Sequence, residues 1–189
     1  MGTTDTSQFR NGLKIELDGQ PFTITYFQHV KPGNGGAFVR TQVKNLLNGR
    51  TIDRTFRSGE KVEEADIEEN SMQYLYNDGE NLVFMDQSTY DQIPIAPAVI
   101  GDQIEFMQEE MNVDVLFWKG KAVNVQLPNY IEAKVIQSDP GVKGDTSSGA
   151  TKPATLECGA TINVPLFIKE GDILKVDTRT REYSERVNG

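Results

Sequence analysis

Turn-forming residues recur along this chain and separate short runs in which apolar and polar side chains alternate. Alternation with a period of two is typical of half-buried β-strands, and pairs such as Asn-Gly and Asp-Gly accept the positive φ angles of tight hairpin turns. The turn signals are Asp18-Gly19, Asn48-Gly49, Asn77-Asp78-Gly79 and Lys119-Gly120. Short strands at intervals of about ten residues predict an all-β protein built from small barrels.

A hairpin is predicted around a glycine-rich segment, with alternating residues 22–27 before it and 37–43 after it. Asn34-Gly35 within this segment predicts a primed turn, in which both residues take positive φ. No side chain bulkier than that of Asn34 lies at the tip, and basic residues flank its base. A slim loop of this kind can enter a narrow space, but the same residues also suit an ordinary solvent-exposed turn.

Three successive β units are predicted, with boundaries at 1–64, 65–128 and 129–189. The first is expected to be a small barrel whose later strands concentrate basic residues, several on one face: Arg40, Lys44, Arg50, Arg54 and Arg57. The second contains two hairpins and weak helical patterns at 90–94 and 104–111. The third has strands near 131–136, 160–164 and 173–177, and a loop at 139–151 whose length is typical of functional loops.

The last two units, of about 60 residues each, suggest paired OB-like barrels, although pieces of a β-sandwich would give a similar pattern. Between the first and second units, residues 63–69 carry many carboxylates. We expect them to form a solvated connector. Trp118, beside a turn, is expected to be a core or rim aromatic rather than a stacking platform.

Charge is distributed unevenly along the chain, which has a net charge of −9. Residues 1–64 hold nine Lys and Arg against seven Asp and Glu, and residues 131–189 hold eight against nine. Residues 65–130 hold two lysines against twelve acids. The two ends can therefore meet phosphates through local basic patches, so the acidic total argues only against indiscriminate RNA binding.

Composition also argues against several function classes. A single cysteine, Cys158, excludes an internal disulfide, and with a single histidine, His29, it argues strongly against a zinc site and a Cys-His nucleophile pair. The glycine-rich segment lacks the order of a phosphate-binding loop and precedes a strand, so no nucleotide cofactor is expected. The chain has neither a secretory signal nor an apolar run of about 20 residues, which indicates a cytoplasmic protein without membrane contact. A binding role is therefore favoured over catalysis, and OB-like modules commonly bind RNA.

The chain resembles the bacterial elongation factor P family from Phe9 to Val187. The third unit carries the most specific pattern: Lys152-Pro153-Ala154-Thr155-Leu156-Glu157, Gly159, Val164-Pro165-Leu166-Phe167-Ile168, Gly171-Asp172, Val176-Asp177-Thr178-Arg179, Tyr183 and Arg186. The first and second units add the tip motif Lys31-Pro32-Gly33-x-Gly and the run Leu75-Tyr76-Asn77-Asp78-Gly79. Residues Gly144-Asp145-Thr146 are similar to the family's Gly-Asp-Thr loop.

The resemblance implies an L-shaped, monomeric mimic of tRNA, with an SH3-like (KOW-like) first domain and two OB domains. Family members bind the 70S ribosome between the P and E sites and promote peptide-bond formation when consecutive prolines stall synthesis. Under this interpretation the tip (Lys31, Pro32, Gly33, Asn34, Gly35, Gly36) faces the CCA end of the P-site peptidyl-tRNA. Gly144, Asp145 and Thr146 lie near the E-site mRNA, and Asp145→Ala is expected to weaken function without unfolding the protein.

The resemblance also suggests further contacts with RNA. In the first domain the candidates are Arg40, Lys44 and Arg54, and in the last domain they are Arg179, Tyr183 and Arg186. The two C-terminal arginines suit either RNA contact or pairing within the barrel.

Two positions depart from the family pattern. Asn34 stands where the family presents a basic residue, often an enzymatically extended lysine. We hypothesise that this protein works unmodified through a shorter neutral tip, or is an engineered or impaired variant. Arg181 stands where a glycine is common, and at a position of positive φ it would cost on the order of 1 kcal/mol.

The leading hypothesis is a translation factor that acts on the ribosome without catalysing a reaction itself. The alternative is an RNA- or protein-binding OB-barrel protein without a role in peptide transfer. An enzyme that uses the glycine-rich loop ranks third.

Overall fold

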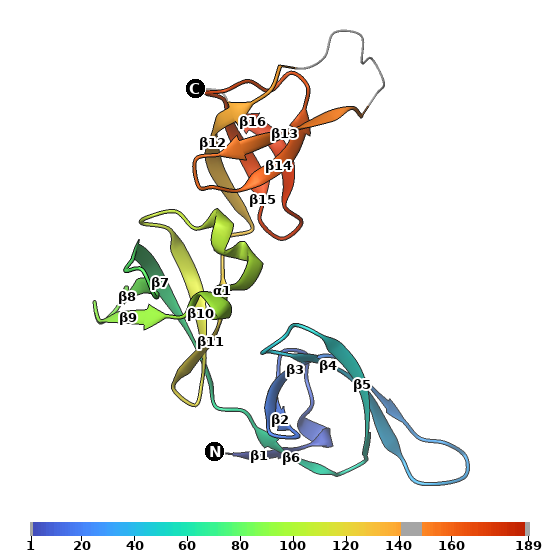
Figure 1. Cartoon of the computed structure of the whole chain (residues 1–189). Helices are drawn as coiled ribbons and strands as arrows, with labels where there is room; N and C mark the ends of the chain where they lie inside the picture. Colours follow the sequence, from blue (N-terminus) through green and yellow to red (C-terminus); the bar gives the residue numbers. More distant parts are fainter. Residues whose placement is uncertain (1, 141–148, 188–189) are drawn as a thin grey trace. The chain divides into compact units, whose positions relative to one another are not determined.

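A computed structural model describes residues 2–140 and 149–187 of the chain, and its strands form three antiparallel sheets (Figure 1). The prediction of an all-β protein is confirmed. The chain divides into two compact units. One comprises Met1–Asn70 with Val115–Val125, and the other comprises Ser71–Asp114 with Gln126–Gly189.

The first sheet is a curled, six-stranded sheet with the order β1-β6-β2-β3-β4-β5 (Figure 1). Its elements are β1 (Thr3–Asp5), the 3-10 helix η1 (Thr6–Gln8), β2 (Lys14–Leu17), β3 (Gln20–Val30), β4 (Phe38–Asn45), β5 (Thr51–Arg57) and β6 (Lys61–Glu64). Alternating apolar residues point inward, and the rings of Phe9 and Phe56 meet edge to face at 5.3 Å. Asp18 and Gly19 both take positive φ (52° and 73°), as the two-residue primed turn between β2 and β3 requires.

The second sheet has the order β11-β10-β7-β8-β9. Its region contains β7 (Ile67–Asn77), β8 (Leu82–Asp86), β9 (Gln92–Ile95), α1 (Pro97–Ile100), the 3-10 helix η2 (Gly101–Phe106), β10 (Asn112–Trp118) and β11 (Lys121–Gln126). Both predicted hairpins are present. At the β10–β11 turn Lys119 and Gly120 take positive φ (52° and 79°), and the Lys119 Nζ lies 3.3 Å from Glu16 Oε1. Trp118 is partly buried there.

The helix prediction at 90–94 is wrong, and the one at 104–111 overlaps the observed helical turns only at residues 104–106. Residues 90–94 contribute to the edge strand β9 instead, because Ile93 pairs with Phe84 of β8 and Ile95 is buried. The helical turns lie at 97–106 and begin at a proline, which suits the first helical position. They end at Met107, whose backbone is extended, and Glu110 then takes a φ of 68°. The sequence pattern at 104–111 was apolar at helical spacing but contained no glycine to mark this early end.

The acidic run at 63–69 is exposed, yet most of it is not a connector. Glu63 and Glu64 close β6, and Glu68 and Glu69 lie in β7, so only Ala65 and Asp66 separate the two strands. Within each pair of adjacent glutamates the side chains point to opposite faces, and both faces are exposed at these strand ends, so the carboxylates are compatible with strand structure.

The third sheet has the order β14-β13-β12-β15-β16 (Figure 1). Its strands are β12 (Tyr130–Ser138), β13 (Thr151–Leu156), β14 (Thr161–Pro165), β15 (Ile173–Asp177) and β16 (Glu182–Val187). The long strand β12 pairs with both β13 and β15, and its register shifts between Val135 and Gln137. Such a shift bends the strand and increases its twist, which suits a curled sheet. Leu156, Ile168 and Leu174 are fully buried in its core.

Candidate functional site

The glycine-rich segment joins the two longest paired strands of the first sheet. Strands β3 and β4 pair from Phe22↔Asn45 to Val30↔Phe38, which leaves residues 31–37 as a seven-residue loop. Of these, Gly35 takes positive φ (108°), whereas Asn34 does not. The predicted two-residue primed turn at Asn34-Gly35 is therefore wrong. A loop of this length needs no positive φ at Asn34, because the bend is spread over several residues.

The loop carries its glycines without any internal packing that requires them. A Cβ placed on Gly33, Gly35 or Gly36 would have no described atom within 4 Å, and Gly33 and Gly36 lie outside the positive-φ region. Residues 33–36 are all exposed. The loop is tied to the barrel at its base, where the Ser58 N–H donates to the Ala37 carbonyl oxygen at 3.0 Å. Only Gly35 is therefore explained by backbone conformation.

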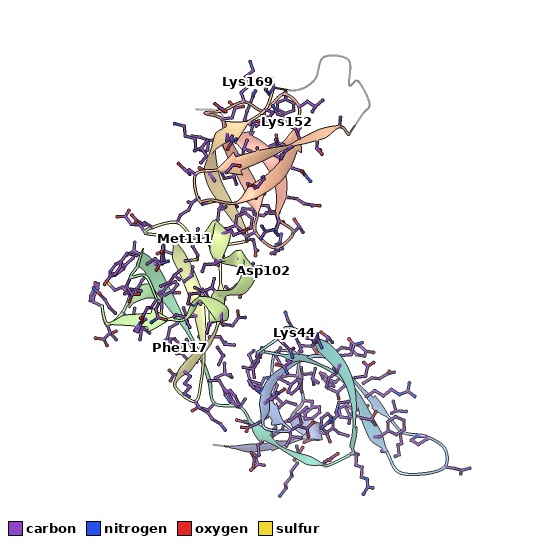
Figure 2. The ribbon with its side chains drawn as sticks, in the orientation of Figure 1. Lys44, Asp102, Met111, Phe117, Lys152 and Lys169 are labelled. Atoms are coloured by element: carbon purple, nitrogen blue, oxygen red, sulfur yellow. The ribbon has the colours of Figure 1, made fainter. Side chains whose placement is uncertain are left out.

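Two of the predicted basic residues share the outer face of the first sheet. Arg40 and Lys44 alternate with the buried Val39, Thr41 and Val43 along β4, and Figure 2 shows Lys44 projecting from the sheet. The Arg40 guanidinium lies 5.6 Å from the centre of the Phe38 ring, a cation–π distance that restrains it on this face.

Arg54, the third predicted RNA contact of this domain, faces the other way. It pairs with the buried Thr41 across β4 and β5, so it lies on the inner face near the end of the barrel. Its Nη2 is 2.9 Å from a carboxylate oxygen of Asp18. The period-2 pattern predicted that several basic residues share a face. It could not give the register between β4 and β5, which places Arg54 opposite the inward Thr41 and not opposite Arg40.

The outer face of β3, β4 and β5 is hollowed, with a volume of about 440 Å³. The outward-facing lining residues are Tyr26, Gln28, Arg40, Gln42, Asp53 and Thr55, and the inward-facing Thr41 and Arg54 lie between them along β4 and β5. Tyr26 is 51% exposed, although Phe22 and Ile24 before it are buried. A bulge between Ile24 and Tyr26 reverses the phase of the strand. Simple alternation misses Tyr26 as a surface residue because a bulge has no reliable sequence signal.

In the third sheet, the predicted arginines are paired within the barrel. Arg179 Nη2 lies 2.9 Å from Asp177 Oδ2, and the guanidinium lies 5.6 Å from the Tyr130 ring centre. Arg186 lies 5.5 Å from the ring centre of Phe167, and its Nη1 is 3.9 Å from Asp172.

Both arginines nevertheless remain partly exposed, with 54% and 39% of their side chains accessible. Tyr183, the third C-terminal candidate, is partly buried opposite Val176.

Asp177 organises the turn that carries Arg179. Its carboxylate accepts hydrogen bonds from the Arg179 side chain and from the backbone N–H groups of Arg179 (2.8 Å) and Thr180 (3.3 Å). These hydrogen bonds, with that of the Arg179 side chain the largest, hold the pKa of Asp177 below its ordinary value.

The predicted loop residues Gly144, Asp145 and Thr146 lie outside the described residues. Its flanks are described, and sequence reasoning missed their main contact. Lys152 at the start of β13 is buried, and its Nζ donates to the Asp139 carbonyl oxygen at 2.6 Å (Figure 2). A lysine within a matched motif gave no sign of burial.

Arg181, the second departure from the resemblance, takes a φ of 63°, so the condition under which an arginine is costly there is met. Its guanidinium pairs with Glu105, donates to the Asp102 carbonyl oxygen at 3.2 Å and lies 5.0 Å from the Phe106 ring centre. These contacts join the β15–β16 turn to η2. They offset the conformational cost of a side chain in this region.

None of the helices in the described part of the chain has the length and apolarity needed to cross a membrane.

Three family models together match nearly the whole chain. Residues 5–62 match the elongation factor P (EF-P) KOW-like domain, residues 67–125 the elongation factor P (EF-P) OB domain, and residues 131–186 the elongation factor P C-terminal domain. The elongation factor P of Carboxydothermus hydrogenoformans is 51% identical over 182 residues, covering 96% of this chain and 98% of the relative. That of Caldanaerobacter subterraneus subsp. tengcongensis is 55% identical over 179 residues, covering 95% and 97%.

Among solved structures, eukaryotic translation initiation factor 5A from Methanococcus jannaschii matches with a TM-score of 0.51 and 23% identity. The match covers 66% of this chain and 95% of that structure. At this identity the likeness concerns the fold alone, which is a KOW-like domain followed by OB domains. The domain matches and the near-full-length identities go further than the fold. They show that this chain belongs to the elongation factor P family of non-enzymatic translation elongation factors.

Proposed function

We propose that this protein binds the ribosome between the P and E sites and stimulates peptide-bond formation where consecutive prolines stall synthesis. The tip at residues 31–36 faces the CCA end of the peptidyl-tRNA. The outer face of β3, β4 and β5 contacts RNA through Arg40 and Lys44. Residues 144–146 approach the E-site mRNA.

The observation that carries this proposal is the tip whose slimness the fold does not require. Gly33 and Gly36 have ordinary backbone angles and open space around them, so alanine would fit at both positions. Glycine without a conformational or internal packing reason indicates close approach by something outside the chain. A narrow cleft lined by RNA is a partner of that kind, and family membership makes the ribosome the natural source of it.

The end of the tip, residues 33–36, offers no acid, base or nucleophile, because Asn34 is its only residue with a side chain. The rate gain therefore has to come from the positioning of the peptidyl-tRNA. A group held in its reactive geometry has already lost translational and rotational freedom, and this lowers the entropic part of the barrier. Asn34 can supply hydrogen bonds to such a partner but no charge.

The test is in vitro translation of a template that encodes consecutive prolines, with Gly33→Ala and Gly36→Ala variants. Each alanine is compatible with the folded conformation, so the free energy of unfolding should stay the same or rise by at most about 0.4–1 kcal/mol. The melting temperature should therefore not fall. Relief of stalling should fall in both variants, because the added methyl groups widen the tip.

A message without consecutive prolines is the control for general translation. The matched variant is Gly59→Ala, which also lies in open space but outside the tip and at a φ of 82°. It should lose a little stability and keep its activity. Unchanged activity of both tip variants, or no relief by the parent protein, would contradict the proposal.

A further inference from the structure

The tip contains one of four Asn-Gly pairs in the chain, at 11–12, 34–35, 48–49 and 188–189. In an Asn-Gly pair the glycine nitrogen can attack the asparagine side chain, because glycine has no Cβ to hinder the approach. Asparagine counts for this reason among the thermolabile residues. Whether a given pair reacts depends on the freedom of the glycine N–H and of the asparagine amide, and the structure distinguishes the described pairs on that basis.

Two of the pairs are restrained by hydrogen bonds. The Gly12 N–H donates to the Ile24 carbonyl oxygen at 2.7 Å, and the Gly49 N–H donates to the Asn45 carbonyl oxygen at 2.8 Å. The Asn48 side-chain oxygen is also engaged, since it accepts from the Arg50 N–H at 2.9 Å. Attack at either site requires a native hydrogen bond to break first.

The pair at the tip has no such restraint among the residues that the structure describes. Neither the Gly35 N–H nor the Asn34 side chain takes part in a hydrogen bond there, and both residues are exposed. A Cβ on Gly35 would meet no described atom within 4 Å, so nothing packs against the reacting atoms. The pair at 188–189 lies outside the described residues. Of the three described pairs, Asn34-Gly35 is therefore free and the other two are restrained.

We propose that Asn34-Gly35 is a spontaneous modification site, at which Asn34 is converted to aspartate and isoaspartate. The Gly35 nitrogen bonds to Cγ of Asn34, the Cγ–Nδ2 bond breaks, and ammonia leaves with the proton of the Gly35 N–H. Water then opens the resulting succinimide at either of its two carbonyl groups. No oxidant, cofactor or enzyme is required.

The product changes the charge of the tip and the length of its backbone. Aspartate and isoaspartate carry a negative charge, and isoaspartate also lengthens the backbone by one methylene group. A negative tip is repelled by RNA phosphates. This consequence for activity rests on the proposed function, whereas the conversion itself does not. Under it the protein would lose activity with age, at a rate set by the tip and independent of unfolding.

The experiment is to incubate the purified full-length protein at mildly alkaline pH in water enriched in oxygen-18. Proteolytic peptides are then quantified by mass spectrometry. Conversion replaces an amide NH₂ by an OH that carries one oxygen from water, which identifies each site. Asn34 should convert roughly fivefold faster than Asn11 or Asn48, since a backbone hydrogen bond must open at the other two sites and contributes about 1 kcal/mol, which is a factor of about five.

Two controls separate the effect of the fold from that of local sequence. In urea the three rates should converge, because the restraining hydrogen bonds are lost. In Asn34→Gln the signal at the tip should disappear, while circular dichroism shows the same fold. Conversion of Asn34 in the native protein at a rate no greater than that of Asn11 and Asn48 would overturn the modification site.

The functional consequence is tested with Asn34→Asp in the polyproline translation assay. Lower relief of stalling than the parent supports it, and equal relief overturns it while leaving the chemistry in place. If the parent itself relieves no stalling, the proposed function fails, and the mass measurement still decides the modification. The same spectra of freshly purified protein would show a lysine-type extension at residue 34 as a much larger mass gain.

Discussion

Asp177 shows how a single side chain can both shape a turn and set a pH limit. Its folded pKa is lowered from the ordinary 3.8 by hydrogen bonds from Arg179 and Thr180. A carboxylate with a depressed folded pKa adds stability that is fully present above the unfolded pKa and is lost as pH falls through the folded pKa. The second unit should therefore lose stability on acidification below about pH 4.

The measurement is urea unfolding as a function of pH for the parent and for Asp177→Asn. The variant keeps an acceptor oxygen for the backbone N–H groups but has no charge to lose. Its stability should be lower at neutral pH and should fall less steeply as the pH drops below about 4, where the ordinary carboxylate begins to be protonated. Parallel pH curves for the two proteins would show that Asp177 has no part in the acid response.

At the same scale, the sequence predicted conformation better than contact. The common glycine at the position of Arg181 raised a positive φ as a condition, and the structure has it at 63°. The partners of Arg181 could not be predicted, because Glu105 is 76 residues away in the sequence. The exposure of Tyr26 could not be predicted for a related reason, since the bulge that exposes it depends on pairing with β4.

At the scale of elements, the β15–β16 turn and η2 are joined by Arg181. Two opposing effects act at this residue. Glycine there would remove a strain of about 1 kcal/mol and would also remove the ion pair with Glu105. Both partners are 40–50% exposed, so the pair itself contributes only about 0.2–1 kcal/mol. Arg181→Gly should consequently change stability little, although it removes a real contact.

A double-mutant cycle separates these effects. Glu105→Gln should lower the free energy of unfolding by up to about 1 kcal/mol in the parent and by almost nothing in the Arg181→Gly background. Arg181→Lys is the control that keeps charge and backbone strain but removes the guanidinium contact with Asp102. Equal effects of Glu105→Gln in the two backgrounds would indicate that the turn and η2 are not coupled.

Elements were predicted well where turn chemistry marked their ends. Asp18-Gly19 and Lys119-Gly120 both place their hairpins correctly, because two left-handed residues fix the register of the strands they join. Helical patterns at 90–94 and 104–111 predicted helices there, whereas the structure has a strand at 92–95 and helical turns at 97–106. Short apolar runs do not distinguish a strand from a helix, and pairing with β8 decides the matter.

At the scale of the whole molecule, the acidic total conceals a separation of charge. Residues 65–130 contain twelve acidic residues and only two lysines, whereas the first domain has more basic than acidic residues. Ribosome binding should therefore depend on a few local cations rather than on net charge. Arg40 and Lys44, on the outer face of the first sheet, are the cations expected to matter.

This expectation is testable by measuring ribosome affinity at several salt concentrations. Arg40→Gln should weaken binding and reduce the slope of log affinity against log salt by about 1, the value for one lost phosphate contact. Arg54→Gln is a matched control, because Arg54 faces inward and pairs with Asp18. An equal loss of slope in both variants would mean that the outer face is not the RNA-binding surface.

The bulge in β3 has a consequence for how the hairpin could change over time. Because it inverts the alternation, the even-numbered residues of β3 point inward before the bulge and outward after it. A deletion of Thr25 would remove only the extra residue, because Ile24 could keep its partner Val43 and Tyr26 its partner Gln42. Tyr26 would stay outward and Phe27 inward, so the same side of the tip would meet any partner. The hairpin is thus tolerant of substitutions at its tip and of this one change in length.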